Sequence, residues 1–138
     1  MKIFSVLVIL LLCGCIGLSQ VSAAPEIPDL VGNWSGVASG YYATENYFFN
    51  ETNGMNYTLS VHEQHGPVLN GTVSIATTYF QASYVFSGII DHDMKTLYIA
   101  ETGTGMDIAH IISPTEIEFI GMDLQNGTSM VVNFTKEP

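Results

Sequence analysis

The histidines and acidic residues of this chain include two short clusters with the residue types of metal sites. His62-Glu63-Gln64-His65 resembles a zinc-protease motif, but its histidines are three positions apart. On a strand, positions i and i+3 point to opposite faces, so this pair cannot bind one metal ion. Asp91-His92-Asp93 lacks the further oxygen ligands and the glycine of a calcium loop. We predict that it is an exposed turn.

Catalytic chemistry has equally little support in the sequence. Glu116 and Glu118 share one face of a predicted strand, whereas a catalytic pair of acids needs a cleft with unequal environments. There is no Gly-x-Ser-x-Gly motif, and both cysteines lie in the N-terminal apolar segment. The sequence therefore predicts no catalytic residue, no metal site and no cofactor.

A different group of residues has the chemistry of a small-molecule site. Tyrosine rings stack on apolar molecules and their hydroxyls form hydrogen bonds, while a carboxylate compensates a positive charge. If Trp34 points inward, strand alternation directs several such side chains into one lumen. The predicted ligand-binding residues are Tyr42, Tyr57, Tyr79, Tyr84, Glu101 and His110. We interpret His110 as a hydrogen-bonded lumen residue rather than a catalytic base.

The segments that must position these residues all read as strands. No stretch after the lead has a helical period, and turn residues such as Gly, Pro, Asn and Asp separate the apolar runs. Eight strands joined by short turns predict an all-β, eight-stranded antiparallel up-and-down (meander) β-barrel. The longest connection, residues 44–54, crosses the end that carries the tyrosines. The predicted strands are residues 30–42, 55–64, 68–79, 82–90, 96–101, 106–112, 115–123 and 128–136.

Two short motifs at the ends of this predicted barrel resemble those of a known group. Gly32-x-Trp34 opens the first strand and Phe134-Thr135-Lys136 closes the last, a pattern similar to that of the calycins, which include lipocalins and avidins. First and last strands are neighbours in an even-stranded barrel, so the Lys136 ammonium is expected over the Trp34 ring, a contact worth ~0.5–2 kcal/mol. The resemblance implies a cavity covered by the long connection. It does not extend to biotin binding, because those sites are walled by several tryptophans and this chain has one.

The first residues read as an export signal. Lys2 precedes an apolar run, and Val21-Ser22-Ala23 is a small-residue cleavage site, so residues 1–23 are predicted to be a signal peptide. Residues 24–29 then form an extended lead and residues 30–137 a single barrel domain. The domain is expected to be secreted or at the cell surface.

A second signal overlaps the first. Leu12-Cys13-Gly14-Cys15 resembles a lipobox, in which Cys15 would carry lipid and anchor the protein. The residues after Cys15 remain apolar instead of forming a polar tether, which favours cleavage after Ala23. Contact with a membrane is expected only if Cys15 is lipidated.

The charge balance excludes several partners. Beyond the signal, Lys95 and Lys136 are the only basic residues, against thirteen acidic ones. Nucleic acids and anionic membrane surfaces need clustered cations. Six of the eight asparagines open an Asn-x-Ser/Thr sequon, which predicts glycosylation if the source modifies exported asparagines. These are Asn33, Asn50, Asn56, Asn70, Asn126 and Asn133.

Two functions are consistent with these features. One is an exported lipocalin-like binding protein that holds a small apolar, neutral or cationic ligand in the barrel mouth, where an anion would lack a cationic partner. The alternative is a non-catalytic cell-envelope glycoprotein or inhibitor-like interaction module, in which the barrel is filled and a protein partner binds an exposed apolar patch. A measured cavity separates the two.

Overall fold

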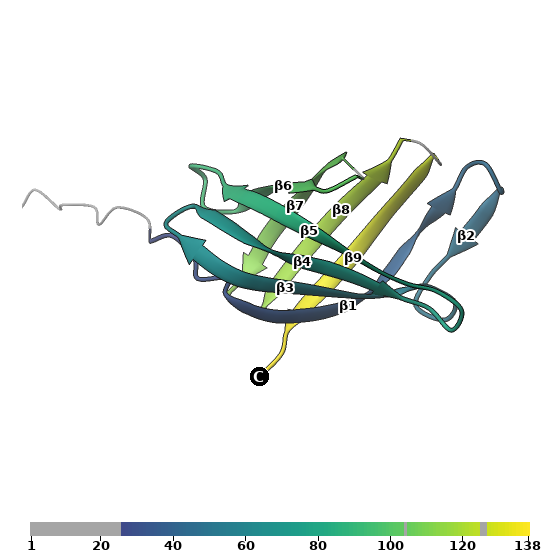
Figure 1. The fold of residues 1–138 in the computed structure, drawn as a ribbon, viewed down its shortest axis with the longest axis horizontal. Helices are drawn as coiled ribbons and strands as arrows, with labels where there is room; N and C mark the ends of the chain where they lie inside the picture. Colours follow the sequence, from purple (N-terminus) through teal and green to yellow (C-terminus); the bar gives the residue numbers. More distant parts are fainter. Residues whose placement is uncertain (1–25, 104, 125–126) are drawn as a thin grey trace, which may run out of the picture.

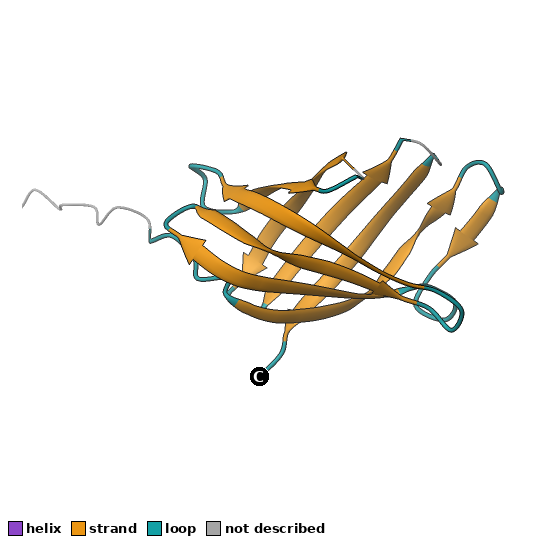
Figure 2. Cartoon of the chain, in the orientation of Figure 1, coloured by secondary structure: helices purple, strands orange, loops and turns teal. Residues whose placement is uncertain are grey.

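Antiparallel strands account for most of the chain that the computed structural model describes, which is residues 26–103, 105–124 and 127–138. The predicted signal peptide, Cys15 and Asn126 lie outside these residues. No helix long and apolar enough to cross a membrane occurs within them. The strands, shown in Figures 1 and 2, are β1 (Gly32–Tyr42), β2 (Tyr47–Phe49), β3 (Asn56–His65), β4 (Val68–Ala76), β5 (Gln81–Ile90), β6 (Thr96–Glu101), β7 (Gly105–Ser113), β8 (Glu116–Asp123) and β9 (Thr128–Lys136).

Eight of these strands close into the predicted up-and-down barrel. Each pairs with its neighbour in the order β1-β3-β4-β5-β6-β7-β8-β9, and β9 pairs back to β1 (Figure 1). Closure gives every strand of the barrel wall a hydrogen-bonded neighbour on both sides. The meander topology predicted from the turn residues is confirmed.

Strand β2 is an addition that the sequence did not reveal. β1 is eleven residues long, and its first half pairs with β3 from Gly32 to Val37. Beyond that point β1 extends past β3, and β2 pairs with it through Gly40 opposite Phe49 and Tyr42 opposite Tyr47. The connection predicted as a loop therefore folds back to satisfy the backbone groups of the extended part of β1.

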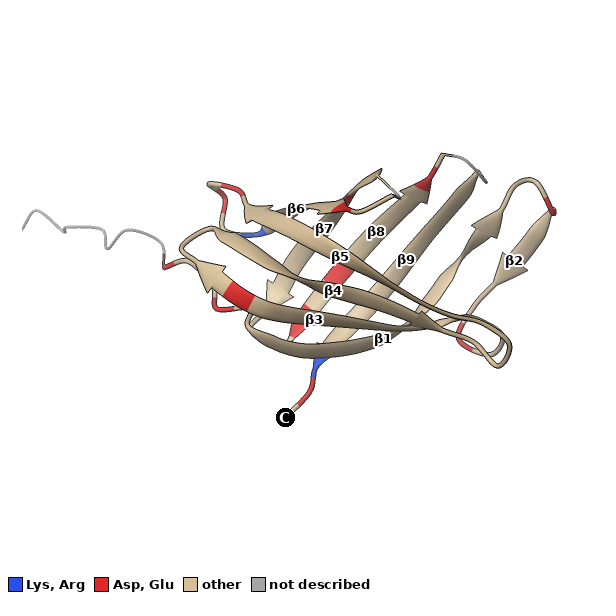
Figure 3. Cartoon of the chain, viewed as in Figure 1, with Lys and Arg blue, Asp and Glu red and all other residues tan. Residues whose placement is uncertain are grey.

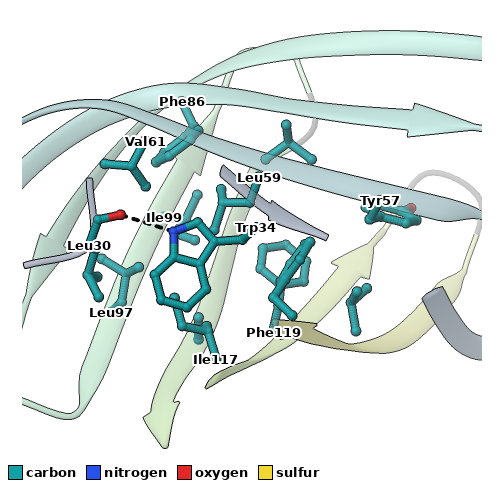
Figure 4. Packing of buried hydrophobic residues seen from close by; sticks show 14 of the residues in the cluster. Leu30, Trp34, Tyr57, Leu59, Val61, Phe86, Leu97, Ile99, Ile117 and Phe119 are labelled. Carbon is teal, nitrogen blue, oxygen red and sulfur yellow. Dashed lines mark hydrogen bonds between the residues drawn. The ribbon is translucent and has the colours of Figure 1, made fainter. Parts of the chain in front are cut away.

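The end of the barrel opposite the tyrosines is closed by Trp34. Its side chain is fully buried and its Nε1 donates a hydrogen bond to the carbonyl oxygen of Leu30 at 3.0 Å (Figure 4). Lys136 lies directly opposite on β9, with Nζ 5.1 Å from the ring centroid. The predicted closing pair is confirmed. The lead is fastened by Gln64, which accepts from Leu30 N and donates to the Pro28 carbonyl oxygen.

The inward faces follow the predicted alternation on every barrel strand except β7. There the buried residues are Asp107, Ala109 and Ile111, so the prediction that His110 faces the lumen is wrong, and Ile108 and Ile112 face outward with it. Ala109 lies opposite Phe119 on β8, and the small side chain leaves room for that ring. Apolar residues occur on both faces of β7, so alternation alone did not fix its phase.

Truncating the tryptophan tests this closed end. We expect Trp34→Ala to lower the free energy of unfolding by about 3–5 kcal/mol, since it empties a fully buried aromatic site. Trp34→Phe, which keeps a ring but loses the Leu30 hydrogen bond, should cost about 1–2 kcal/mol. Lys136→Met, which keeps an apolar stem, should cost less than about 2 kcal/mol. Denaturant unfolding measures all three; wild-type stability in Trp34→Ala would contradict the burial of this residue.

Candidate ligand-binding site

A pocket of about 220 Å³ opens at the end of the barrel away from Trp34. Buried side chains such as Trp34, Phe86 and Phe119 fill the barrel below it (Figure 4). The lumen is therefore partly filled and partly open, and the open part is the mouth. The pocket is lined by Tyr42, Met55, Tyr57, Ile75, Phe80, Tyr84, Glu101, Asp107, Met122, Asp123, Thr128 and Met130.

One side of the mouth is formed by tyrosines from β1, β3 and β5. We call Tyr42, Tyr57 and Tyr84 the tyrosine wall. The Tyr57 hydroxyl lies 3.1 Å from the sulfur of Met130, and the Tyr42 hydroxyl lies 3.6 Å from the sulfur of Met55. Methionine sulfurs are weak acceptors and polarizable contacts, so this wall is soft and mostly apolar with phenolic groups at its surface.

The unexpected strand β2 supports this wall. Phe49 is fully buried, and its ring centroid lies 4.9 Å from that of Tyr42. The contact requires a glycine on β1: a Cβ at Gly40 would lie 2.3 Å from the Ser129 carbonyl oxygen and 2.7 Å from the Phe49 ring. β2 thus packs Phe49 against the Tyr42 ring and stabilises one side of the pocket.

The next strands around the barrel, β6, β7 and β8, contribute a carboxylate each. We call Glu101, Asp107 and Asp123 the acidic wall. Asp107 is the most enclosed of the three, at 8% exposed, and its Oδ1 accepts a hydrogen bond from the Met122 N–H at 3.2 Å. Burial raises the pKa of Asp107 and the nearby Asp123 adds to this increase, while the Met122 hydrogen bond opposes it.

The two walls interact electrostatically. Burial raises the pKa of Tyr57 strongly, with further increases from Tyr42, Glu101 and Asp107. Tyr57 therefore stays a neutral phenol that can donate or accept a hydrogen bond. The pKa of Tyr42 is also raised, first by burial and then by nearby acids.

Positive charge is placed far from this mouth. Among the described residues, the lysines are Lys95, just before β6, and Lys136, at the end of β9, and both strand ends lie at the closed end of the barrel (Figure 3). None of the described residues that line the pocket is a lysine or arginine. A carboxylate entering the mouth would meet three acids and no cation, which is unfavourable for an anion.

One polar atom of the lining lacks a partner. Thr128, at 9% exposed, has a buried hydroxyl with no hydrogen-bond partner among the described residues. Thr128 lies beside Tyr42 on one strand and Asp123 on the other, at the seam between the two walls. A buried hydroxyl without a partner costs about 1–3 kcal/mol. This unsatisfied oxygen belongs to a residue that lines the pocket.

Four of the six predicted lining residues are brought together at the pocket: Tyr42, Tyr57, Tyr84 and Glu101. His110 lies on the outer face of β7, since its neighbours Ala109 and Ile111 are the buried ones. The expectation that His110 faces the lumen is therefore wrong.

Tyr79 is also misplaced by the prediction. β4 ends at Ala76, and the Thr77 hydroxyl then accepts hydrogen bonds from the N–H groups of Tyr79 and Phe80. This turn leaves Tyr79 98% exposed and turns Phe80 towards the pocket. Extending the strand to residue 79 caused the error, because a hydroxyl-capped turn replaces the last predicted strand residues.

The acidic wall was largely missed in the sequence. Asp107 has the same parity as Ala109 and Ile111, so reading β7 in the other phase would have found it. Asp123 lies at the last position of β8, where an acid reads as part of a turn. The methionines of the lining gave no sequence signal, because Met is ordinary core material.

The rejected motifs occur on the surface. His65 and Glu63 form an exposed pair at 2.7 Å, and Asp93 caps its turn by accepting from the N–H groups of Lys95 and Thr96. No group of three or more His, Cys, Asp or Glu side chains in the described ranges is arranged to hold a metal ion.

Four of the predicted glycosylation sites are exposed asparagines on strands: Asn33 on β1, Asn56 on β3, Asn70 on β4 and Asn133 on β9. Asn50 is half-buried in the turn after β2, where its side chain accepts a hydrogen bond from the Thr52 N–H. No sequon begins on β5, β6, β7 or β8.

Comparison with known proteins gives a fold likeness. No protein-family model matches the chain, and no curated protein matches it. A solved structure described as a redesigned β-barrel is similar, with a TM-score of 0.59 and 11% sequence identity, covering 79% of this chain and 92% of that one. At this identity the likeness establishes the barrel fold alone. The resemblance to calycins remains a prediction.

The buried acid generates a testable pH dependence. Because the folded-state pKa of Asp107 is raised above its usual 3.8, its contribution to stability is present below that value and is lost as pH rises through the folded pKa. We expect Asp107→Asn, which keeps an acceptor for Met122 N–H, to raise the melting temperature at neutral pH and to have little effect in acid. Thermal unfolding across pH measures this.

The matched control for charge removal is Glu116→Gln, because Glu116 is exposed on the outer face of β8. We expect its effect on stability to stay within about 0.5 kcal/mol at every pH. A lower melting temperature of Asp107→Asn at neutral pH would show that the carboxylate stabilises the fold instead.

Proposed function

We propose that the protein is an exported binding protein that holds a small, largely apolar molecule, neutral or cationic, in the barrel mouth. The pocket of about 220 Å³ above a filled core carries this proposal. Eight-stranded barrels either fill their interior with side chains or leave room for one small ligand. The lower layers of this barrel are filled, whereas the mouth layer is open and combines apolar surface with a few convergent polar groups, as ligand sites do.

Binding is favoured over catalysis by the composition of the lining. Within the described ranges, the lining includes no histidine or cysteine, and His110 faces outward. The lining acids are accompanied by phenols and methionines, which provide shape and weak polar contacts rather than a nucleophile with an adjacent base. We therefore propose a non-enzymatic role.

The position of the lead fits an exported protein of either processing type. Leu30 is buried against Trp34 at the closed end, so the chain enters the barrel on the side opposite the pocket. Cleavage after Ala23 would release a free barrel. Lipid at Cys15 would tether the barrel by its closed end.

A cavity-filling variant tests the proposal. Ile75 lines the pocket, so Ile75→Phe should occupy its volume and weaken binding by tenfold or more, as expected for a loss of about 1.4 kcal/mol or more. Native mass spectrometry of the exported protein would report a retained molecule in the wild type and its absence in the variant. Ile112→Phe on the exposed outer face of β7 is the matched control. Equal retention in both variants would contradict binding at the mouth.

A second function has a specific observation in its favour. Six outward-facing residues on consecutive strands lie directly opposite one another across the sheet, and we call them the outer apolar row. Each is at least partly exposed, and a row of exposed apolar side chains supports a role in protein contact. The row is Val68, Ile89, Tyr98, Ile108, Ile120 and Val131.

The sequons support this second candidate. The middle of the outer apolar row lies on β5, β6, β7 and β8, the strands on which no sequon begins. Glycans on β1, β3, β4 and β9 would cover the rest of the barrel and leave this face accessible. We propose, as the alternative, a cell-envelope protein partner that binds the outer apolar row.

Photocrosslinking tests the alternative. A photoreactive phenylalanine at position 98 should give a covalent adduct of defined mass with an envelope protein, whereas one at position 60, on the outer face of β3, should not. Ile89→Lys should reduce the adduct at position 98, since it places a charge in the middle of the row. Adducts of equal yield at both positions would contradict a partner specific to this face.

A further inference from the structure

The tyrosine wall and the acidic wall of the mouth differ in chemistry. In strand order, the tyrosine wall comes from β1, β3 and β5, and the acidic wall comes from β6, β7 and β8. One side therefore presents aromatic rings and the other presents carboxylates. A molecule that satisfies both needs an apolar body and a positive end.

We propose that the pocket is specific for a small organic ammonium ion, with its charged group against the acidic wall and its apolar part against the tyrosine wall. Asp107 is the main counter-ion, supported by Glu101. The inference rests on the proposed function, because it assigns the class of ligand to the same pocket.

Asp107 is the residue that most needs a cationic partner. Its carboxylate is buried, and the Met122 N–H that it accepts is a neutral donor, which does not compensate the charge. Burying a carboxylate without a counter-charge is costly. The lysines of the described residues lie at the closed end, so a cation that compensates the ionised form of Asp107 has to come from a bound molecule. A carboxylate can also accept more than one hydrogen bond, which suits an ammonium group.

Tyr57 and Thr128 favour an ammonium that carries N–H donors. Tyr57 lines the same pocket as Asp107 and interacts electrostatically with it, so an ammonium group bound at Asp107 also lies near the Tyr57 ring. The Thr128 hydroxyl has no hydrogen-bond partner in the part of the chain that the structure describes, and it can accept one N–H. A quaternary ammonium ion would gain the ring contact and lose that hydrogen bond.

The volume limits the size of the ligand. At about 220 Å³ the pocket is smaller than the roughly 300–1,000 Å³ typical of drug-sized ligands. It suits a single-ring or short-chain amine. A long-chain lipid would extend well outside the mouth.

The experiment uses three probes that share a phenyl ring on a two-carbon chain and differ in the terminal group: 2-phenylethylamine, 2-phenylethanol and 3-phenylpropionate. Each is titrated into the folded exported protein at neutral pH while tyrosine fluorescence and heat are followed. Hydrogen bonds to charged groups contribute enough for about a tenfold to hundredfold difference in affinity. We expect the amine to bind that much more tightly than the alcohol, and the carboxylate to bind least.

Variants then assign the charge. Asp107→Asn should weaken amine binding by about tenfold to hundredfold and leave alcohol binding unchanged, because it removes the charge with little change in shape. Glu101→Gln should act in the same direction, and it replaces Asp107→Asn as the deciding variant if the latter does not fold. Thr128→Val should weaken the amine but not its trimethylammonium analogue. Glu116→Gln, outside the pocket, should change none of these affinities.

The outcomes separate this inference from the proposed function. Equal affinity for amine and alcohol, or an amine affinity unchanged in both carboxylate variants, overturns the cation inference and leaves the binding function standing. Absence of binding by all three probes, together with no molecule retained by the exported protein, overturns both. Preference for the carboxylate probe overturns the assignment of the acidic wall.

Discussion

Closure of the barrel between β1 and β9, fixed by Trp34 against Lys136, is the constraint on which the other features depend. Once Trp34 is inward, alternation along β1 places Ala38 inward and directs Tyr42 to the mouth, and the pairing with β9 places Thr128 beside Tyr42. A shift of one residue would turn every side chain of a strand to the other face. The register that buries one indole at the closed end therefore also decides which phenols and hydroxyls reach the open end.

The same constraint separates the barrel into two ends of different character. The closed end has a filled core, a buried indole and the lysines, while the mouth has an open layer with carboxylates and phenols. This polarity follows from the direction of the strands: β6 starts after Lys95 and ends at Glu101, and β8 ends at Asp123. In an up-and-down barrel each strand runs from one end to the other, so the placement of charge along each strand becomes a difference between the two ends.

Local patterns predicted most of this arrangement, and they failed where two signals competed. Alternation and turn residues located the eight barrel strands, and the pairing of Trp34 with Lys136 followed from even strand number. The prediction for β7 was wrong because Ile108 and Ile112 together are more hydrophobic than Ala109 and Ile111. In the structure Ala109 faces inward opposite Phe119. The sequence did not predict β2, because three residues are too few for a periodic signal. The stability of β2 comes from its pairing with β1, which is a tertiary property.

β7 is also where the structure departs most from the usual rule for a barrel. It turns an acid, Asp107, towards the lumen and two isoleucines, Ile108 and Ile112, towards the outside. Each choice costs stability, since a buried carboxylate loses hydration and an exposed isoleucine gains no burial. Departures from local consistency are expected at functional sites, where stability is given up for binding. The inner side of β7 belongs to the pocket and its outer side to the outer apolar row, so both proposed binding surfaces meet on this one strand.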